Sequence, residues 1–79
     1  MTRVAPSGRL AIFPGSFDPL TNGHVDIILR GVHLFERIVV AILVNAEKNP
    51  LFTAQERVEI IRDVFREYSN VEADTFDGL

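Results

Sequence analysis

Two kinds of apolar pattern alternate along this chain. Residues 9–13 and 38–44 are almost continuously apolar, which is typical of parallel strands buried on both faces. Apolar side chains recur at helical spacing over residues 25–35 and again over residues 53–68. A weaker, alternating run covers residues 71–76. The pattern therefore predicts the order strand, helix, strand, helix, strand.

The first predicted helix carries a main apolar stripe and a second, flanking one. The main stripe predicts the inner face and consists of Val25, Ile28, Leu29, Val32 and Phe35. The second stripe, Ile27 and Leu34, indicates a helix covered on two sides. Gly31 costs about 1 kcal/mol against alanine inside a helix. We therefore expect close packing against a neighbour at Gly31.

A capping box predicts the start of the second helix, because Thr53 and Glu56 stand at the spacing that satisfies two free backbone donors. The helix is expected to end near Tyr68. Its inner face is predicted to consist of Val58, Ile61, Phe65 and Tyr68. Its charged residues are interpreted as the solvated face: Glu56, Arg57, Glu59, Arg62, Asp63, Arg66 and Glu67.

This order of elements, with short links, predicts a parallel sheet with right-handed crossovers. The fold class is α/β, a Rossmann-like β-α-β-α-β unit that forms one mononucleotide-binding half of a doubly wound fold. Ligands of such folds bind outside the carboxyl ends of the strands. The loops at residues 14–24 and 45–50 are both expected at that edge, so they converge on one crevice.

Length and composition add that this sheet is small and rich in apolar residues. The 79 residues suffice for one domain, and residues 1–8 are interpreted as a flexible leader. A chain of this size buries only about 60% of the surface that its unfolded form exposes. Since 47% of the residues are hydrophobic, we expect some apolar surface to require a partner, either more chain or another subunit.

Charge and cysteine content exclude several function classes. The net charge of -3 and the absence of a basic block argue against binding to nucleic acid. No cysteine is present, so there is neither a disulfide framework nor a thiolate metal site. No apolar stretch approaches the ~20 residues that span a membrane, and the start lacks the apolar core of a signal peptide. A soluble cytoplasmic protein is expected.

The candidate chemistry lies in the loop that follows the first predicted strand. His24 stands in the first turn of the predicted helix, where free backbone N–H groups and the positive end of the macrodipole suit a bound phosphate. Neither a G-x-G-x-x-G fingerprint nor a P-loop is present. His24 and His33 are not at metal-binding spacing. The remaining constellation is Ser16 and His24 together with Lys48.

Residues 15–24, GSFDPLTNGH, resemble the signature of the nucleotidyltransferase superfamily. The TNGH version, in place of His-x-Gly-His, is similar to that of the phosphopantetheine adenylyltransferase family. The similarity continues through residues 45–50, NAEKNP, and on to Glu56 and Arg57. It covers nearly the whole chain from Arg9.

The resemblance implies a step of coenzyme A biosynthesis. In that step 4′-phosphopantetheine and ATP give dephospho-coenzyme A and pyrophosphate, with Mg²⁺, by direct in-line attack on the α-phosphate. It further implies that His24 binds ATP phosphate and stabilises the transition state, and that Ser16 and Phe17 help to hold ATP. Ser16 and Lys48 would hold the phosphate of phosphopantetheine. The resemblance also implies a homohexamer, the usual assembly of the intact family, and coenzyme A itself as a ligand.

Other residues of the loop are given supporting or structural roles. Gly15 and Gly23 are expected to allow the backbone to approach phosphate, and Gly23 to double as a helix cap. Asp18 and Thr21 are interpreted as loop architecture that bonds nearby backbone groups. His33 is interpreted as a surface residue of the helix.

The family's chain is about twice this length, so residues 9–79 are interpreted as the N-terminal half of a nucleotidyltransferase domain. The half of the family's domain that lies outside these residues carries the adenine-binding groups, and the 79 residues alone are expected to be inactive or very weak. One alternative is another adenylyl- or cytidylyltransferase, such as an enzyme acting on nicotinamide mononucleotide. A second alternative is a non-catalytic module that self-associates through an open sheet edge.

Overall fold

The computed structural model describes residues 9–44 and 48–77 and has the predicted order of elements. The strands are β1 (Leu10–Gly15), β2 (Arg37–Leu43) and β3 (Val71–Phe76). The helices are α1 (Asn22–Val32) and α2 (Ala54–Val64), so α2 ends before the expected limit near residue 68. The interpretation of residues 1–8 as a leader lies outside the described residues. In the described part of the chain, no helix has the length and apolarity needed to cross a membrane.

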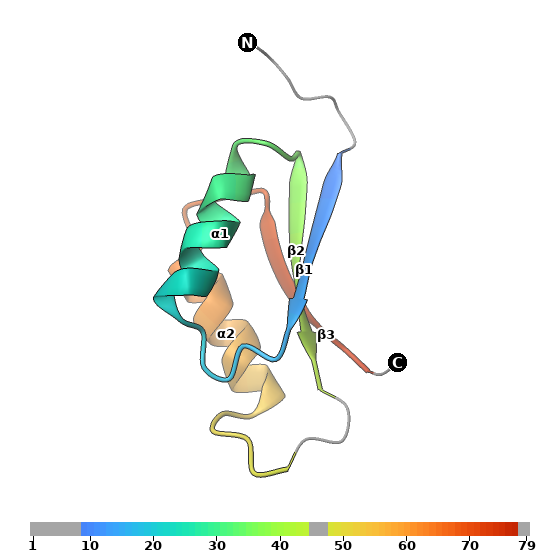
Figure 1. Cartoon of the computed structure of the whole chain (residues 1–79), viewed down its shortest axis with the longest axis vertical. Coiled ribbons are helices and arrows are strands. Elements are labelled where there is room, and N and C mark those ends of the chain that lie inside the picture. The colour runs from blue at the N-terminus through green and yellow to red at the C-terminus, as the bar shows by residue number, and fades with distance from the viewer. Residues whose placement is uncertain (1–8, 45–47, 78–79) are drawn as a thin grey trace.

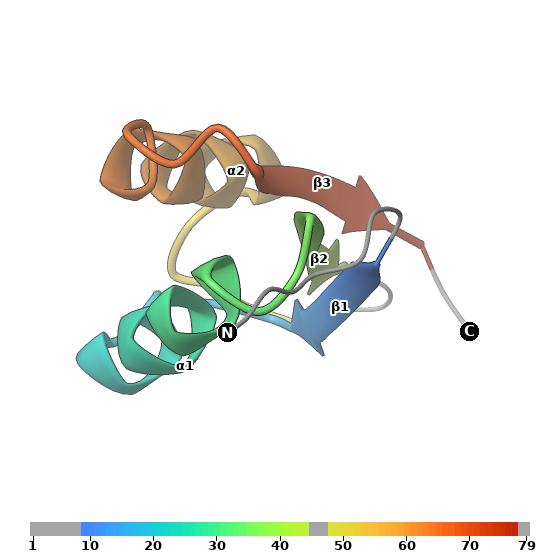
Figure 2. The same ribbon diagram turned by 90° about the horizontal axis from the view of Figure 1, so that it is seen from above.

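The three strands form one parallel sheet in the order β1-β2-β3. Both helices cover the same face of this sheet, as Figure 1 shows from the side and Figure 2 from above. Two successive right-handed crossovers that step in the same direction across a sheet place their helices on one face. The Rossmann-like β-α-β-α-β architecture is thereby confirmed.

The core lies between β2 and the two helices. Ile38, Val40 and Ile42 point from β2 toward the helices and are fully buried. The helices meet them with buried apolar side chains: Ile28 of α1, Val58 and Ile61 of α2, and Phe65, which directly follows α2. The predicted inner faces of both helices are confirmed, with Tyr68 packed half-buried at the edge of the core.

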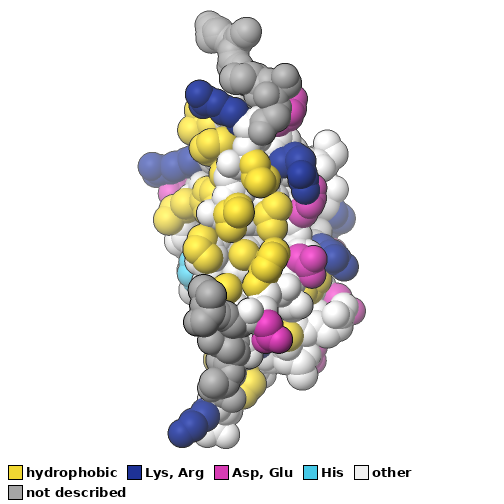
Figure 3. All heavy atoms as spheres, turned by 90° about the vertical axis from the view of Figure 1, so that its right-hand side faces the viewer, with side chains coloured by type: hydrophobic (Ala, Val, Ile, Leu, Met, Phe, Trp, Pro, Cys, Tyr) yellow, Lys and Arg dark blue, Asp and Glu magenta, His cyan; other side chains and the backbone are white. Residues whose placement is uncertain are grey.

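The second face of the sheet is not covered by any described element. Leu10 and Ile12 of β1 are 47% and 60% exposed, and Leu43 and Phe76 are 38% and 44% exposed. Figure 3 views this side of the molecule and shows hydrophobic side chains across its centre. The expectation that the strands are buried on both faces was therefore wrong within the described residues, because both helices lie on the opposite face.

Helix α1 is likewise covered on one side only. Ile27 and Leu34 are 55% and 60% exposed, contrary to the expectation of a helix covered on two sides. The expectation for Gly31 is confirmed, because a Cβ there would lie 3.3 Å from both Phe13 Cζ and Ile38 Cδ1. The absence of a side chain at Gly31 lets the helix approach the sheet closely.

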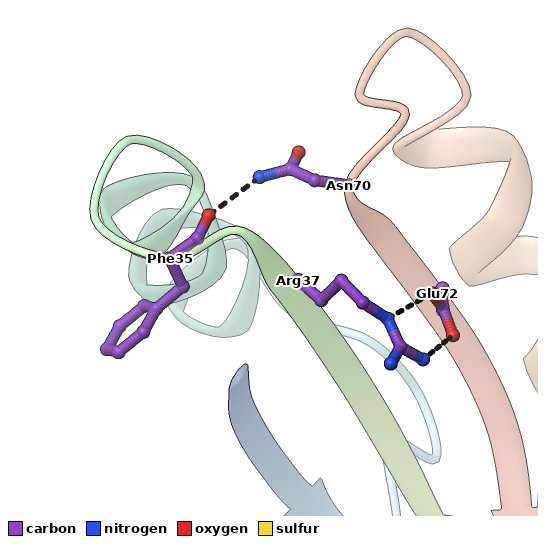
Figure 4. A network of polar contacts seen from close by, with 4 residues as sticks. All are labelled: Phe35, Arg37, Asn70 and Glu72. Atoms are coloured by element: carbon purple, nitrogen blue, oxygen red, sulfur yellow. Dashed lines mark hydrogen bonds and ion pairs between the residues drawn. The ribbon is translucent and has the colours of Figure 1, made fainter. Parts of the chain in front are cut away.

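Polar contacts tie the amino-terminal ends of β2 and β3 together, at the end of the sheet away from the candidate site (Figure 4). Arg37 donates from Nε and Nη2 to the two carboxylate oxygens of Glu72, each at 2.9 Å. The hydrogen bonds from Arg37 hold the pKa of the Glu72 carboxyl below its ordinary value. The Asn70 side-chain amide donates to the Val32 and Phe35 carbonyls and so fastens the end of α1 to β3.

Candidate functional site

The two loops expected to carry chemistry lie at the carboxyl end of the sheet. One follows β1 and leads into α1, and the other follows β2 and leads into α2. Figure 1 shows both at the lower end of the molecule. The middle of the second loop, residues 45–47, lies outside the described residues, whereas Lys48 and the residues after it are described.

His24 is the third residue of α1 and takes part in capping that helix. The Thr21 side chain accepts a hydrogen bond from the His24 backbone N–H, and the Thr21 backbone N–H donates to His24 Nδ1 at 3.0 Å. This reciprocal pair is a capping box with histidine in the position that glutamate or glutamine usually takes. The helix cap is therefore Thr21, and the expectation that Gly23 doubles as a cap was wrong.

The capping bond fixes the tautomer of the His24 ring. A backbone N–H can only donate, so Nδ1 must accept and the neutral imidazole carries its proton on Nε2. The Nε2–H group is then the side of the ring that can donate to a ligand. An N–H donor at a helix start, beside the free amides of the first turn, suits a phosphate oxygen.

The ring of Phe17 packs against the ring of His24. Phe17 is 5% exposed, has a φ of 50°, and meets His24 edge to face with ring centroids 4.9 Å apart. Both rings line a cavity of about 270 Å³ whose wall is otherwise apolar and includes Ile12 and Ile27. A histidine donor in an apolar wall gives the cavity one polar contact point, as is common in ligand sites.

The two glycines of the loop have different surroundings. A Cβ at Gly15 would lie 3.1 Å from Cε2 of Phe17, so the lack of a side chain there lets the Phe17 ring pack. A Cβ at Gly23 would meet only Thr21 Oγ1, at an ordinary 3.6 Å. Packing within the chain therefore explains Gly15, whereas approach of a ligand to the backbone stays the prediction for Gly23.

Ser16 is exposed, and its backbone carbonyl is bound by Arg57 of α2, a residue that the sequence pattern had placed on the solvated face of that helix. The Arg57 guanidinium donates from Nη1 to the Ser16 carbonyl at 2.9 Å and from Nε to the Thr53 carbonyl at 3.3 Å. Arg57 is only 2% exposed, so its interpretation as part of a solvated face was wrong. Its position one turn before buried Ile61 is the sequence signal that indicates the inner face.

Asp18 joins the two loops. Its Oδ2 accepts from the Leu51 N–H at 2.8 Å and its Oδ1 from the Phe52 N–H at 2.9 Å. The role of Asp18 in loop architecture is confirmed, although its partners belong to the other loop and not to its own. Lys48 is exposed in that second loop, three residues before Leu51.

The two loops carry mainly hydrogen-bond donors: the Ser16 hydroxyl, backbone amides and the His24 ring in the first, and the Lys48 ammonium in the second. Phe17 and His24 line the cavity, whereas Ser16 and Lys48 are not among its lining residues. Both oxygens of the nearby Asp18 carboxylate accept backbone N–H groups of the second loop. Within residues 9–44 and 48–77, no group of three or more His, Asp or Glu side chains is placed to hold a metal ion. Donor groups suit an anionic ligand, because they can neutralise the charge that phosphoryl-type transfer develops.

Comparison with protein families matches residues 12–79 to the cytidylyltransferase-like family. Curated phosphopantetheine adenylyltransferases are similar to the chain. Those of Desulforamulus reducens and Caldanaerobacter subterraneus subsp. tengcongensis are each 56% identical over 71 residues, 90% of this chain. The chain spans about 44% of the length of these two relatives.

Solved structures support the fold independently of sequence. The NadR protein in complex with NR superposes with a TM-score of 0.75 at 18% identity, over 86% of this chain and 19% of that one. The NadR protein in complex with NAD and AMP-PNP gives a TM-score of 0.71 at 20% identity, over 87% and 20%. At these identities the likeness shows a shared fold.

Proposed function

The chain belongs to the cytidylyltransferase-like family, and on that basis we propose that it forms the phosphate-binding part of a phosphopantetheine adenylyltransferase. The observation that carries this proposal is the 56% identity with curated phosphopantetheine adenylyltransferases over 90% of the chain. The donor-rich loops at the carboxyl end of the sheet fit the same activity.

In the proposed reaction, a phosphate oxygen of 4′-phosphopantetheine attacks the α-phosphorus of ATP. The new O–P bond forms as the bond between the α-phosphorus and the bridging oxygen breaks, and pyrophosphate leaves with that oxygen. The attacking phosphate is already anionic, so no base is required. The chain's contribution is positioning and neutralisation of charge.

Each candidate residue receives a role in this proposal. His24 donates from Nε2 to ATP phosphate and stabilises the charge that grows during transfer. The Ser16 hydroxyl and the Ser16 and Phe17 amides hold phosphate oxygens, and the Lys48 ammonium holds the phosphate of phosphopantetheine. Gly23 leaves room for the ligand to approach the backbone.

The described residues do not offer a protein-based metal site. Mg²⁺ is usually bound through substrate phosphates and water with few protein carboxylates. We therefore propose that the Mg²⁺ expected from the resemblance is bound chiefly through the phosphates of ATP. A cytoplasmic location and a hexameric assembly stay predictions.

A hybrid enzyme tests the proposal, because the chain spans less than half of its relatives. The chain replaces the corresponding part of the Desulforamulus reducens enzyme, and pyrophosphate release is measured with ATP and either 4′-phosphopantetheine or nicotinamide mononucleotide. We expect release with phosphopantetheine, abolished by His24→Ala, and no release from the 79-residue chain alone. Release only with nicotinamide mononucleotide would instead support the alternative transferase.

A further inference from the structure

Three consecutive residues of the first loop are each held by a contact from outside it. The Ser16 carbonyl accepts from Arg57, the Phe17 ring packs under His24, and the Asp18 carboxylate accepts from Leu51 and Phe52. Two of these three contacts come from the second loop and the start of α2. The loop that follows β1 is therefore fastened to the loop that follows β2.

The Asp18 carboxylate forms two charge-assisted hydrogen bonds to the second loop. Both carboxylate oxygens accept from consecutive backbone amides at 2.8 and 2.9 Å, and hydrogen bonds to an ionised acceptor are stronger than neutral ones. The two amides lie directly before Thr53, the N-cap of α2, where the helix macrodipole also favours a negative charge. Asp18 thus fixes the end of the second loop.

The Arg57 contact supplies a second fixed point. A guanidinium that is 2% exposed has lost its hydration and must be compensated by hydrogen bonds. The Arg57 guanidinium donates both to the Thr53 carbonyl at the start of its own helix and to the carbonyl of Ser16, which lies 41 residues before Arg57. The bridge ties the backbone of Ser16 to the first turn of α2.

We propose that Asp18 and Arg57 are positioning residues that hold Ser16 and Lys48 at a fixed separation, so that two bound phosphates lie in line for transfer. The inference rests on the proposed function, since it assigns phosphate binding to both loops. Neither residue touches substrate in this scheme. Their effect is on the alignment of the two loops, where small displacements cost rate.

The test uses the 79-residue chain and Mn²⁺·ATP as a paramagnetic probe, with amide signals observed by ¹⁵N NMR. In the unchanged chain, Mn²⁺·ATP should broaden the amides of residues 16–24 and also those of Lys48 and Asn49. In Asp18→Asn and Arg57→Lys, broadening over residues 16–24 should persist while that at Lys48 and Asn49 is lost. Mn²⁺ without ATP corrects for ion binding at surface carboxylates.

Matched controls separate positioning from folding. Asp26→Asn and Arg66→Lys make the same chemical changes at exposed ion pairs and should leave both sets of signals broadened. The core amides of Ile38 and Val40 report whether each variant keeps its fold. In the hybrid enzyme, the two positioning variants should lose about 10²-fold in kcat with little change in KM for ATP.

The outcomes distinguish this inference from the function on which it rests. Broadening at Lys48 and Asn49 that survives in both folded variants overturns the positioning role and leaves the proposed function standing. If the unchanged chain shows no broadening over residues 16–24 and the hybrid enzyme that carries it releases no pyrophosphate, both proposals fall. If the hybrid enzyme releases pyrophosphate although the unchanged chain shows no broadening, the proposed function stands, and the kcat of the two positioning variants in the hybrid decides the positioning role. If only one variant loses the Lys48 broadening, the positioning role belongs to that residue alone, and the assignment of the other is refuted.

Discussion

His24 serves a helix and, in our proposal, a ligand, and substitutions at this position separate the two roles. Its Nδ1 accepts the Thr21 N–H in a capping box, whereas its Nε2–H faces the ligand in the proposed reaction. Glutamate is the usual residue at this position of a capping box. His24→Glu therefore keeps the cap but presents a negative charge to phosphate, and His24→Ala removes both functions.

The structure sets the expected magnitudes for stability. His24→Ala loses the acceptor of one capping hydrogen bond, which costs about 0.5–1.5 kcal/mol, and an edge-to-face contact with Phe17, which contributes about 0.5–1.5 kcal/mol. His24→Glu loses the ring contact but gains about 0.3–1 kcal/mol from an acidic side chain in the first turn. The alanine variant should thus be less stable by about 1–3 kcal/mol, and the glutamate variant should be close to the unchanged chain.

The expected order for binding differs from the order for stability. A hydrogen bond from His24 to a charged phosphate contributes about 1.5–3 kcal/mol, so His24→Ala should weaken MgATP binding by about 10- to 150-fold. His24→Glu adds repulsion and should bind more weakly still. Urea unfolding followed by circular dichroism gives the stabilities, and titration with MgATP followed by NMR gives the affinities.

Two results would refute the reasoning about His24. If His24→Glu is destabilised as much as His24→Ala, the capping box does not exist in solution and the tautomer assignment fails. If His24→Glu binds MgATP as well as the unchanged chain, His24 is a helix cap and nothing more. His24→Gln is the control, because it keeps a capping acceptor and a neutral N–H donor.

Three further substitutions probe the surroundings of the site. Gly15→Ala places a Cβ 3.1 Å from the Phe17 ring and should destabilise the chain by about 1–3 kcal/mol in urea unfolding; an unchanged midpoint would show that the ring can shift. For Glu72→Gln, the hydrogen bonds from Arg37 hold the pKa of the Glu72 carboxyl below its ordinary value, so the stabilisation is present above that ordinary value and is lost as the pH falls through the lowered pKa. The urea midpoints of the unchanged and variant chains should differ at neutral pH and converge in acid, and a constant difference would contradict the linkage. Ile12→Ser on the open sheet face should leave the urea midpoint nearly unchanged and reduce any self-association seen by light scattering, because Ile12 is 60% exposed; a fall in stability would mean that the side chain is buried.

Much of the fold could be predicted because local signals and tertiary structure agree. The apolar run of β2 and the stripes of both helices identify the core side chains, and the Thr53 and Glu56 capping box marks the start of α2. Element order together with crossover handedness leaves few topologies. The sequence could not predict which faces of the sheet are covered. An apolar run indicates that a strand favours burial, but it does not indicate which element packs on it.

The connections of the candidate site could not be predicted from the sequence, and the ligand-binding roles of its residues stay predictions. The motif places Ser16 and His24, and the strand order brings Lys48 to the same edge of the sheet. The bonds from Asp18 to the second loop join residues 33 and 34 positions apart, and no local pattern reports such a distance. Arg57 was missed because charge was given more weight than its place on the inner stripe of α2.

The three strands differ on the open face in a way that limits where another layer can pack. On that face β1 presents Leu10 and Ile12, whereas β3 presents Glu72, which is paired with Arg37, then Asp74, and an apolar side chain, Phe76, only at its end. Fully burying one large apolar side chain contributes about 1.5–3 kcal/mol, whereas burying a carboxylate is unfavourable unless it is well paired. A layer packed on this face would therefore gain most from covering β1 and β2 and least from covering the start of β3. The continuous apolar runs of β1 and β2 and the alternating pattern of β3 thus have the same cause: apolar side chains favour burial and carboxylates favour solvent. The described helices cover only the opposite face of the sheet.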